Sequence, residues 1–181
     1  MKADYNVQVE WLAFDLRPNT PPEGIPRTDP PGEKRVGLPV DGHLGEMAQE
    51  AGIIMRRPPI VAYTRSSMEV GELAKAQGKF DDYHLGALKA YWEDGKNIGD
   101  LKVLQEIGAH AGLDPAEIAE VLQDRRYAQA VQGQVDFAHQ IGITGIPAYI
   151  VGRYLFTGAQ QYDFFKMVAD KVLAEHEEPK S

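Results

Sequence analysis

A long block of helical sequence is enclosed between two segments with the pattern of strands. Apolar residues recur at helical spacing through residues 41–142. Before this block, Val7, Val9 and Trp11 alternate with polar residues, which predicts a strand over residues 7–14. After it, residues 146–151 and 154–156 are short apolar runs around a Gly-Arg turn, and they predict a hairpin and then a last helix. The pattern predicts an α/β protein whose residues 1–40 and 143–181 form one part, with residues 41–142 inserted as a helical domain.

The connection between the predicted first strand and the helices is rich in proline. Seven of the twelve prolines fall between Arg17 and Pro39. Proline has no backbone N–H and restricts the residue before it, so this stretch suits neither a helix nor an inner strand. We therefore expect an extended loop on the surface of the domain.

Within the block, five or six helices are marked by local signals at their ends. Asp41 is placed to cap the first, and Thr64 or Ser66 to start the second. Residues 114–117, with the sequence DPAE, combine a capping Asp, a Pro at the first helical position and a Glu three residues after the cap. In the helix that follows Gly78, the spacing predicts a buried face that consists of Phe80, His84, Leu88, Tyr91 and Trp92.

The composition excludes several classes of function. The formal net charge is −8, which disfavours sequence-independent binding of nucleic acid. The 181 residues contain no cysteine, so they can form no disulfide, thiolate nucleophile or Cys-ligated zinc site. No run of about 18 apolar residues is present, so we expect no membrane span. The start of the sequence lacks the apolar run of a signal peptide, and we expect a cytoplasmic protein.

The most specific local feature is GITGIP at residues 142–147, directly before a strand. A proline at a strand entry, after a turn that contains glycine, is a candidate for a cis peptide bond, although turn chemistry alone leaves trans the more frequent form. The five histidines form no HxxxH or HExxH pattern, and Ser66-Ser67 lacks the GxSxG context of a nucleophile. The pairs Arg56-Arg57 and Arg125-Arg126 could bind an anion, but we expect them only to offset local acidity. From the residues alone, no catalytic group, metal site or cofactor is expected.

Three segments carry a family resemblance. VEWLAFDLRPNTPPEG (residues 9–24) resembles the second-strand region of DsbA-family thioredoxin-like proteins, especially the FrnE-like branch. YTRSSMEVGELAKAQGKFDDYH and the sequence up to Asp114 resemble the inserted helical domain of that branch. GITGIPAYIVGRYLFTGAQQYDFF (residues 142–165) resembles its cis-proline loop, hairpin and last helix. The resemblance implies a thioredoxin-like fold, incomplete at the N-terminus, with an inserted α-helical domain, and a cis Ile146–Pro147 bond.

The family opens with a strand, a turn that carries CxxC and a first helix, and these have no counterpart here. No catalytic residue can therefore be assigned. The resemblance implies a substrate-binding role for Thr144, Gly145, Ile146 and Pro147, which we call the TGIP loop. In the family this loop presents backbone groups to an extended thiol substrate, so the implied partner is a polypeptide that carries a thiol or disulfide.

In the thioredoxin arrangement the missing strand is central. Without it, the strand at residues 7–14 and the hairpin would each have an unpaired edge. We consider three explanations: a truncated gene product or misassigned start, a second copy that fills the gap, or a first strand that slides into it. An apolar patch around Val7, Val9, Trp11, Tyr149 and Val151 is expected to be exposed, and a homo-oligomer or a sheet completed by a partner is expected to cover it.

Three functions agree with this sequence. The first is a DsbA-family, FrnE-like oxidoreductase relative that is inactive in thiol–disulfide exchange because it has no cysteine. The second is a non-catalytic binding or assembly module. The third, which has the least support, is a relative of the 2-hydroxychromene-2-carboxylate isomerases and kappa-class glutathione transferases.

Overall fold

Two compact units make up the protein. The structure is a computed structural model that describes residues 4–177. One unit combines Met1–Leu16 with Gln134–Ser181, and the other is Arg17–Gly133. These divisions differ from the sequence-based domain boundaries at residues 40 and 142, which stay a prediction. We describe each unit by itself.

The proline-rich loop belongs to the larger unit because its backbone pairs with the segment before the second helix. Strand β1 (Ile25–Pro26) pairs antiparallel with β2 (Ile60–Val61). Further along the loop, the N–H of Gly37 donates to the carbonyl of Arg57 at 2.9 Å. Apart from these bonds the loop has little regular structure, as its proline content predicts.

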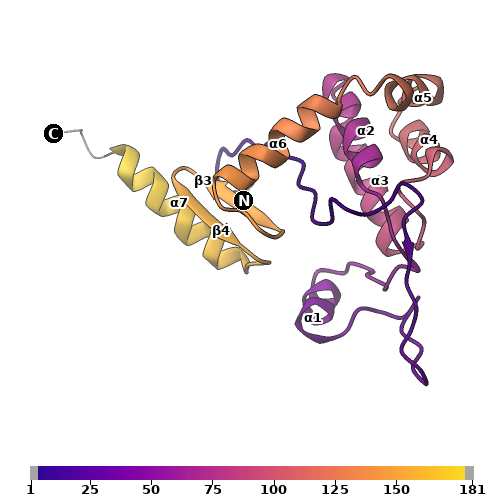
Figure 1. Cartoon of the computed structure of the whole chain (residues 1–181). Coiled ribbons are helices and arrows are strands. Elements are labelled where there is room, and N and C mark those ends of the chain that lie inside the picture. Colours follow the sequence, from indigo (N-terminus) through magenta and orange to yellow (C-terminus); the bar gives the residue numbers. More distant parts are fainter. Residues whose placement is uncertain (1–3, 178–181) are drawn as a thin grey trace. The chain divides into compact units, whose positions relative to one another are not determined.

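Helix α1 (Gly42–Glu50) follows this loop, and four further helices form the core of the larger unit. They are α2 (Arg65–Ala76), α3 (Phe80–Trp92), α4 (Leu101–His110) and α5 (Pro115–Asp124). These four lie against one another (Figure 1). Apart from Glu69, their largest fully buried side chains are aliphatic residues at helical spacing, among them Leu73, Leu104 and Ile118. The predicted helical block is thus confirmed.

The buried face of α3 is rotated from the predicted one. Tyr83, Ala87 and Ala90 are buried, whereas Leu88 is exposed. Small alanines let the neighbouring helices approach α3 closely, while Phe80 packs against the core only partly buried. The Tyr83 hydroxyl bonds Ser67, and burial raises its pKa above the ordinary range.

Three aspartates occupy N-cap positions in the larger unit, and two of them cap through the side chain. The side chain of Asp100 accepts from the N–H of Lys102 at 2.8 Å, and that of Asp114 accepts from the N–H of Ala116 at 2.9 Å. Asp114 was the cap expected for α5, and it is confirmed. Asp41 occupies the N-cap position of α1, as expected, but makes no side-chain cap bond.

The smaller unit contains an antiparallel hairpin and a long helix. Strands β3 (Ala148–Val151) and β4 (Tyr154–Thr157) pair so that Ile150 lies opposite Leu155. Helix α7 (Tyr162–Glu177) follows them, and helix α6 (Ala128–Gln140) precedes the hairpin. The predicted hairpin and both helices are confirmed. Among residues 4–177, no helix is both long and apolar enough to cross a bilayer.

The prediction of a strand at residues 7–14 is wrong. Residues 6–15 contain no helix, turn or bend, but they pair with no strand among the described residues. A β-strand requires hydrogen bonds to a neighbouring strand, and the alternation of apolar and polar residues in one segment does not provide that neighbour. This stretch, residues 6–14, is referred to below as the extended segment.

Candidate functional site

The TGIP loop begins where helix α6 ends. The N–H of Gly142 donates to the carbonyl of His139 at 3.0 Å, and the N–H of Ile143 donates to that of Ala138 at 2.9 Å. Gly142 has a φ of 83°, the left-handed conformation that ends many helices. Ile143 is buried, so the chain is anchored immediately before the loop.

The four residues of the loop lie at the surface. Ile146 is 54% exposed, Thr144 and Pro147 are exposed and Gly145 is half-buried. The Ile146–Pro147 peptide bond is cis, the conformation implied by the family resemblance. The carbonyl of Pro147 accepts from the N–H of Gly158 at 2.8 Å, which ties the end of the loop to the residue after β4.

The backbone of the loop has unused hydrogen-bonding groups. Within residues 4–177, the N–H groups of Thr144, Gly145 and Ile146 donate to no protein acceptor. Backbone N–H groups require a partner, either water or another chain. An extended polypeptide laid along the loop could accept from them, as in β-strand addition. The loop can therefore bind a chain through its backbone, with the exposed Ile146 side chain as an apolar contact.

Aromatic packing holds the hairpin on α7. The ring of Tyr149 lies 4.8 Å from that of Phe165, and the ring of Phe156 lies 5.0 Å from that of Phe164. Burial raises the pKa of Tyr149. At the hairpin turn, Gly152 comes so close to Val172 that a side chain there would clash with it. This packing makes a firm base for the strand that the TGIP loop enters.

The predicted exposed apolar patch is wrong for its two hairpin residues. Tyr149 and Val151 are half-buried, and Tyr149 faces α7, so alternation along the strand turns Ile150 and Leu155 outward instead. Val9 and Trp11 are exposed, as predicted, while Val7 is half-buried.

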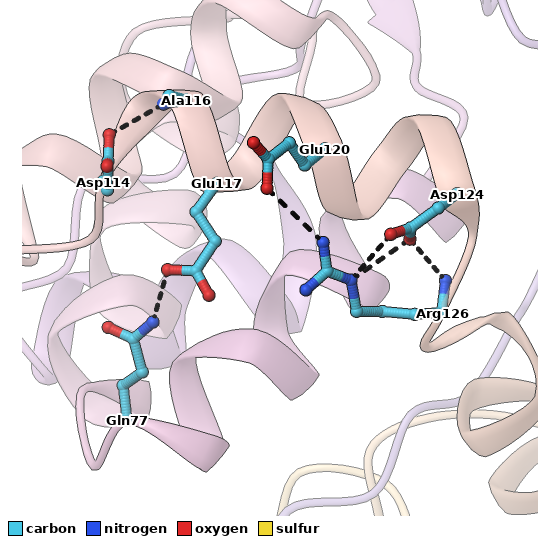
Figure 2. A network of polar contacts seen from close by, with 7 residues as sticks. All are labelled: Gln77, Asp114, Ala116, Glu117, Glu120, Asp124 and Arg126. Atoms are coloured by element: carbon cyan, nitrogen blue, oxygen red, sulfur yellow. Dashed lines mark hydrogen bonds and ion pairs between the residues drawn. The ribbon is translucent and has the colours of Figure 1, made fainter.

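Titratable residues elsewhere form structural contacts. Figure 2 shows Arg126 beside Asp124 and Glu120 at the end of α5, and Gln77 donating to Glu117 near its start. The hydrogen bonds from Arg126 lower the pKa of Asp124. All of these side chains have access to solvent, so the ion pairs add little stability. Among residues 4–177, no three potential ligands gather as they would in a metal site.

The sequence pattern did not predict one ion pair, in which the carboxylate is buried and the guanidinium is half exposed. Arg125 donates from Nε to Glu69 Oε2 at 3.1 Å, and its Nη2 lies 2.7 Å from Oε1. Partial burial lowers the pKa of Arg125, but the charges and hydrogen bonds of Glu69 and Tyr63 more than offset this and raise it. Glu69 is fully buried in α2, and its partner is 56 residues away in sequence, so no local pattern reveals the pair.

The TGIP loop, with its cis proline, connects helix α6 to the β3–β4 hairpin, and the hairpin packs on helix α7. This arrangement is typical of thioredoxin-like α/β proteins. The model of the DSBA-like thioredoxin domain matches residues 1–168, and the chain belongs to this family. Thioredoxin-like fold and DsbA-family membership, both implied by the resemblance, are confirmed.

Two similar proteins extend the comparison. The chain is 28% identical over 170 residues to the uncharacterized protein YwbO of Bacillus subtilis, across 92% of this chain and 83% of that protein. It also resembles the crystal structure of a probable DsbA oxidoreductase from Streptomyces coelicolor, with a TM-score of 0.70 and 27% identity. That match covers 76% of this chain and 61% of the Streptomyces chain, so the alignment leaves more than a third of the solved protein without a counterpart.

Proposed function

We propose that the chain is a FrnE-like member of the DSBA-like thioredoxin family that binds an extended polypeptide at the TGIP loop and performs no thiol–disulfide exchange with its own residues. The observation that carries this proposal is the exposed TGIP loop, with three unused backbone N–H groups, in a sequence without cysteine. A cytoplasmic location stays a prediction.

The physical basis for binding is the exposed edge of the loop. N–H groups of Thr144, Gly145 and Ile146 offer main-chain hydrogen bonds that do not depend on the sequence of the ligand. The side chain of Ile146 adds apolar contact. No charged residue occurs between Ile141 and Gly152, so an uncharged stretch of polypeptide would meet no buried charge there.

The absence of exchange chemistry follows from what the reaction needs. A thiolate must attack a disulfide sulfur, and these 181 residues contain no thiol. Similarity to a probable DsbA oxidoreductase supports a polypeptide that carries a thiol or disulfide as the ligand. Binding and exchange would then be separate properties, and this chain would have only the first.

Two assays test the proposal. Insulin reduction by dithiothreitol should proceed at the rate of a blank without protein, and any turnover above that blank would contradict the inactivity. Fluorescence anisotropy with a labelled, reduced and unfolded polypeptide should detect binding. Ile146→Asp should weaken it about tenfold, because burial of the exposed part of an isoleucine contributes roughly 1 kcal/mol and a buried carboxylate opposes binding.

Leu173→Asp supplies the matched control, since Leu173 lies on α7 and is 51% exposed. It should leave the affinity unchanged. Equal losses in the two variants would mean that the ligand binds through general apolar contact and not at the loop.

A further inference from the structure

Residues 39–56 form a closed excursion of the larger unit that carries helix α1. The two ends of the excursion meet where Pro39 and Arg56 form an antiparallel β-bridge. Of the nine residues of α1, only Ala48 is buried. A helix this short is marginal without packing from other groups, so further contact with α1 would stabilise it.

A cavity of about 510 Å³ is lined by α1 and by the chain segments on either side of it, and we call it the α1 cavity. Sites for small ligands commonly have volumes of about 300–1,000 Å³. The least exposed side chains of its lining are apolar, namely Val40, Ala48 and Met55. Ile53 and Ile54 also line the cavity, yet they are 55% and 50% exposed. A ligand that covered them would remove apolar surface from water.

The backbone fixes the walls of this cavity. The N–H of Val40 donates to the carbonyl of Met55 at 2.9 Å, next to the bridge at the base of the excursion. A Cβ at position 45 would clash with the carbonyl oxygen of Val40, so Gly45 lets α1 pack directly on the backbone before it. The helical wall and the loop wall are thus held close together at one side of the cavity.

Charged groups of both signs line the α1 cavity. Asp41 and Glu46 supply carboxylates from the N-cap and the middle of α1, and Arg56 supplies a guanidinium from the end of the excursion. Within residues 4–177, the side chains of Asp41 and Arg56 form neither an ion pair nor a hydrogen bond. Glu46 lies 3.9 Å from the exposed His43, at the limit of an ion pair. These groups are therefore available to a ligand that carries both a cation and an anion.

The separation of the charges fits a short peptide. Asp41 is two residues from Pro39, and Pro39 lies opposite Arg56 in the bridge. The Cα atoms of Asp41 and Arg56 are therefore no more than about 12 Å apart. An extended tripeptide spans about 10 Å, so its two termini can reach the two side chains at once.

We propose that the α1 cavity binds short apolar peptides through their free termini. The N-terminal ammonium pairs with the carboxylates of Asp41 and Glu46. The C-terminal carboxylate pairs with Arg56, whose planar guanidinium can donate two parallel hydrogen bonds to it. Apolar side chains of the peptide cover Ile53 and Ile54. The cavity belongs to the larger unit, and the inference stands independently of binding at the TGIP loop.

Isothermal titration calorimetry of the full chain with trileucine tests the proposal. Trileucine should bind with a dissociation constant below about 1 mM. N-acetyl-trileucine and trileucine amide each lack one terminal charge, and each should bind about ten times more weakly, because a charge-assisted hydrogen bond is lost. Equal affinities for the three peptides would overturn recognition of the termini. Failure of trileucine to saturate the chain at about 10 mM would overturn the site itself.

Matched variants locate the site. Arg56→Gln should weaken trileucine binding about tenfold and should abolish the preference for trileucine over its amide. Arg57→Gln changes a neighbouring arginine that does not line the cavity, and it should alter neither. Asp41→Asn should likewise weaken trileucine about tenfold and abolish the preference over the N-acetyl form, whereas Glu50→Gln, on α1 but outside the lining, should have no effect.

The fold of these variants can be compared by far-UV circular dichroism, which should match the parent because Asp41, Glu50 and Arg56 are exposed. Equal losses in the Arg56 and Arg57 variants would show that trileucine responds to the general charge of the surface, and the proposal would be wrong. A preference for the free carboxylate that persists in Arg56→Gln would contradict it as well.

Discussion

Removing Arg125 should destabilise the larger unit more than neutralising its partner Glu69. The two side chains form a bidentate ion pair, with contacts of 3.1 and 2.7 Å. Their environments differ: the Glu69 side chain is 1% exposed and the Arg125 side chain is 47% exposed. Arg125→Ala therefore leaves a buried carboxylate without a partner, whereas Glu69→Gln leaves a guanidinium that is already half in water.

The magnitudes follow from this asymmetry. A buried charge whose partner is removed costs about 3–5 kcal/mol. Water can reach the space that Arg125 vacates, so we reduce the expected loss for Arg125→Ala to about 2–3 kcal/mol. For Glu69→Gln the side-chain volume is kept and a charge-assisted hydrogen bond is weakened, so the expected loss is about 1 kcal/mol. Backbone strain does not contribute to the difference, because both Arg and Ala carry a Cβ at the positive φ of 57°.

Urea unfolding followed by far-UV circular dichroism measures these free energies. The double variant should lose less than the sum of the two single losses, because a neutral amide in place of the Glu69 carboxylate does not require the cation. A loss for Arg125→Ala below about 0.5 kcal/mol, or a larger loss for Glu69→Gln than for Arg125→Ala, would refute the reasoning.

Three further predictions concern the larger unit and can be read from the same unfolding curves. Leu104→Ala, in the fully buried centre of the core, should cost about 2–5 kcal/mol, while Leu101→Ala, at an exposed position of the same helix, should cost under about 1 kcal/mol; equal losses would contradict the described core. Asp114→Ala removes the cap of α5 and should cost about 0.5–2 kcal/mol, with Asp114→Asn as the control that keeps an acceptor. Burial lowers the pKa of His84 below its ordinary value of 6.5, so the unfolded chain binds more protons; the stability that neutral His84 supplies is complete above pH 6.5 and is lost as pH falls through the folded-state pKa. His84→Gln should flatten this acid dependence, and an unchanged pH profile would contradict it.

Local signals predicted the helices well. The four core helices follow from apolar spacing and from caps such as Asp114, which act within a few residues of the helix they start. The rotated face of α3 shows the limit of periodicity, because Phe80 and Leu88 share a spacing that suits burial, yet the neighbouring helices pack on Ala87 and Ala90. Which stripe is buried depends on partners that a single helix does not specify.

Features that depend on residues far apart in the sequence were not predicted, because local patterns do not specify the partners. The extended segment alternates like a strand, but strand formation depends on a ladder partner, and none is present in residues 4–177. Glu69 has the sequence context of a surface residue, and only the fold brings Arg125 to it. The TGIP loop was found from its sequence, its binding role was implied by the family resemblance, and its open N–H groups became visible only in the structure.

Nuclear magnetic resonance tests the central claim, that the TGIP loop binds an extended polypeptide. A titration of the isotopically labelled 20.0 kDa chain with a reduced, unfolded polypeptide would follow each backbone amide separately. Our account predicts that the amides of Thr144, Gly145 and Ile146 shift most and saturate together, while those of α2 to α5 stay unchanged. Saturating shifts confined to another surface, or no shift at the loop at concentrations where anisotropy reports binding, would contradict it.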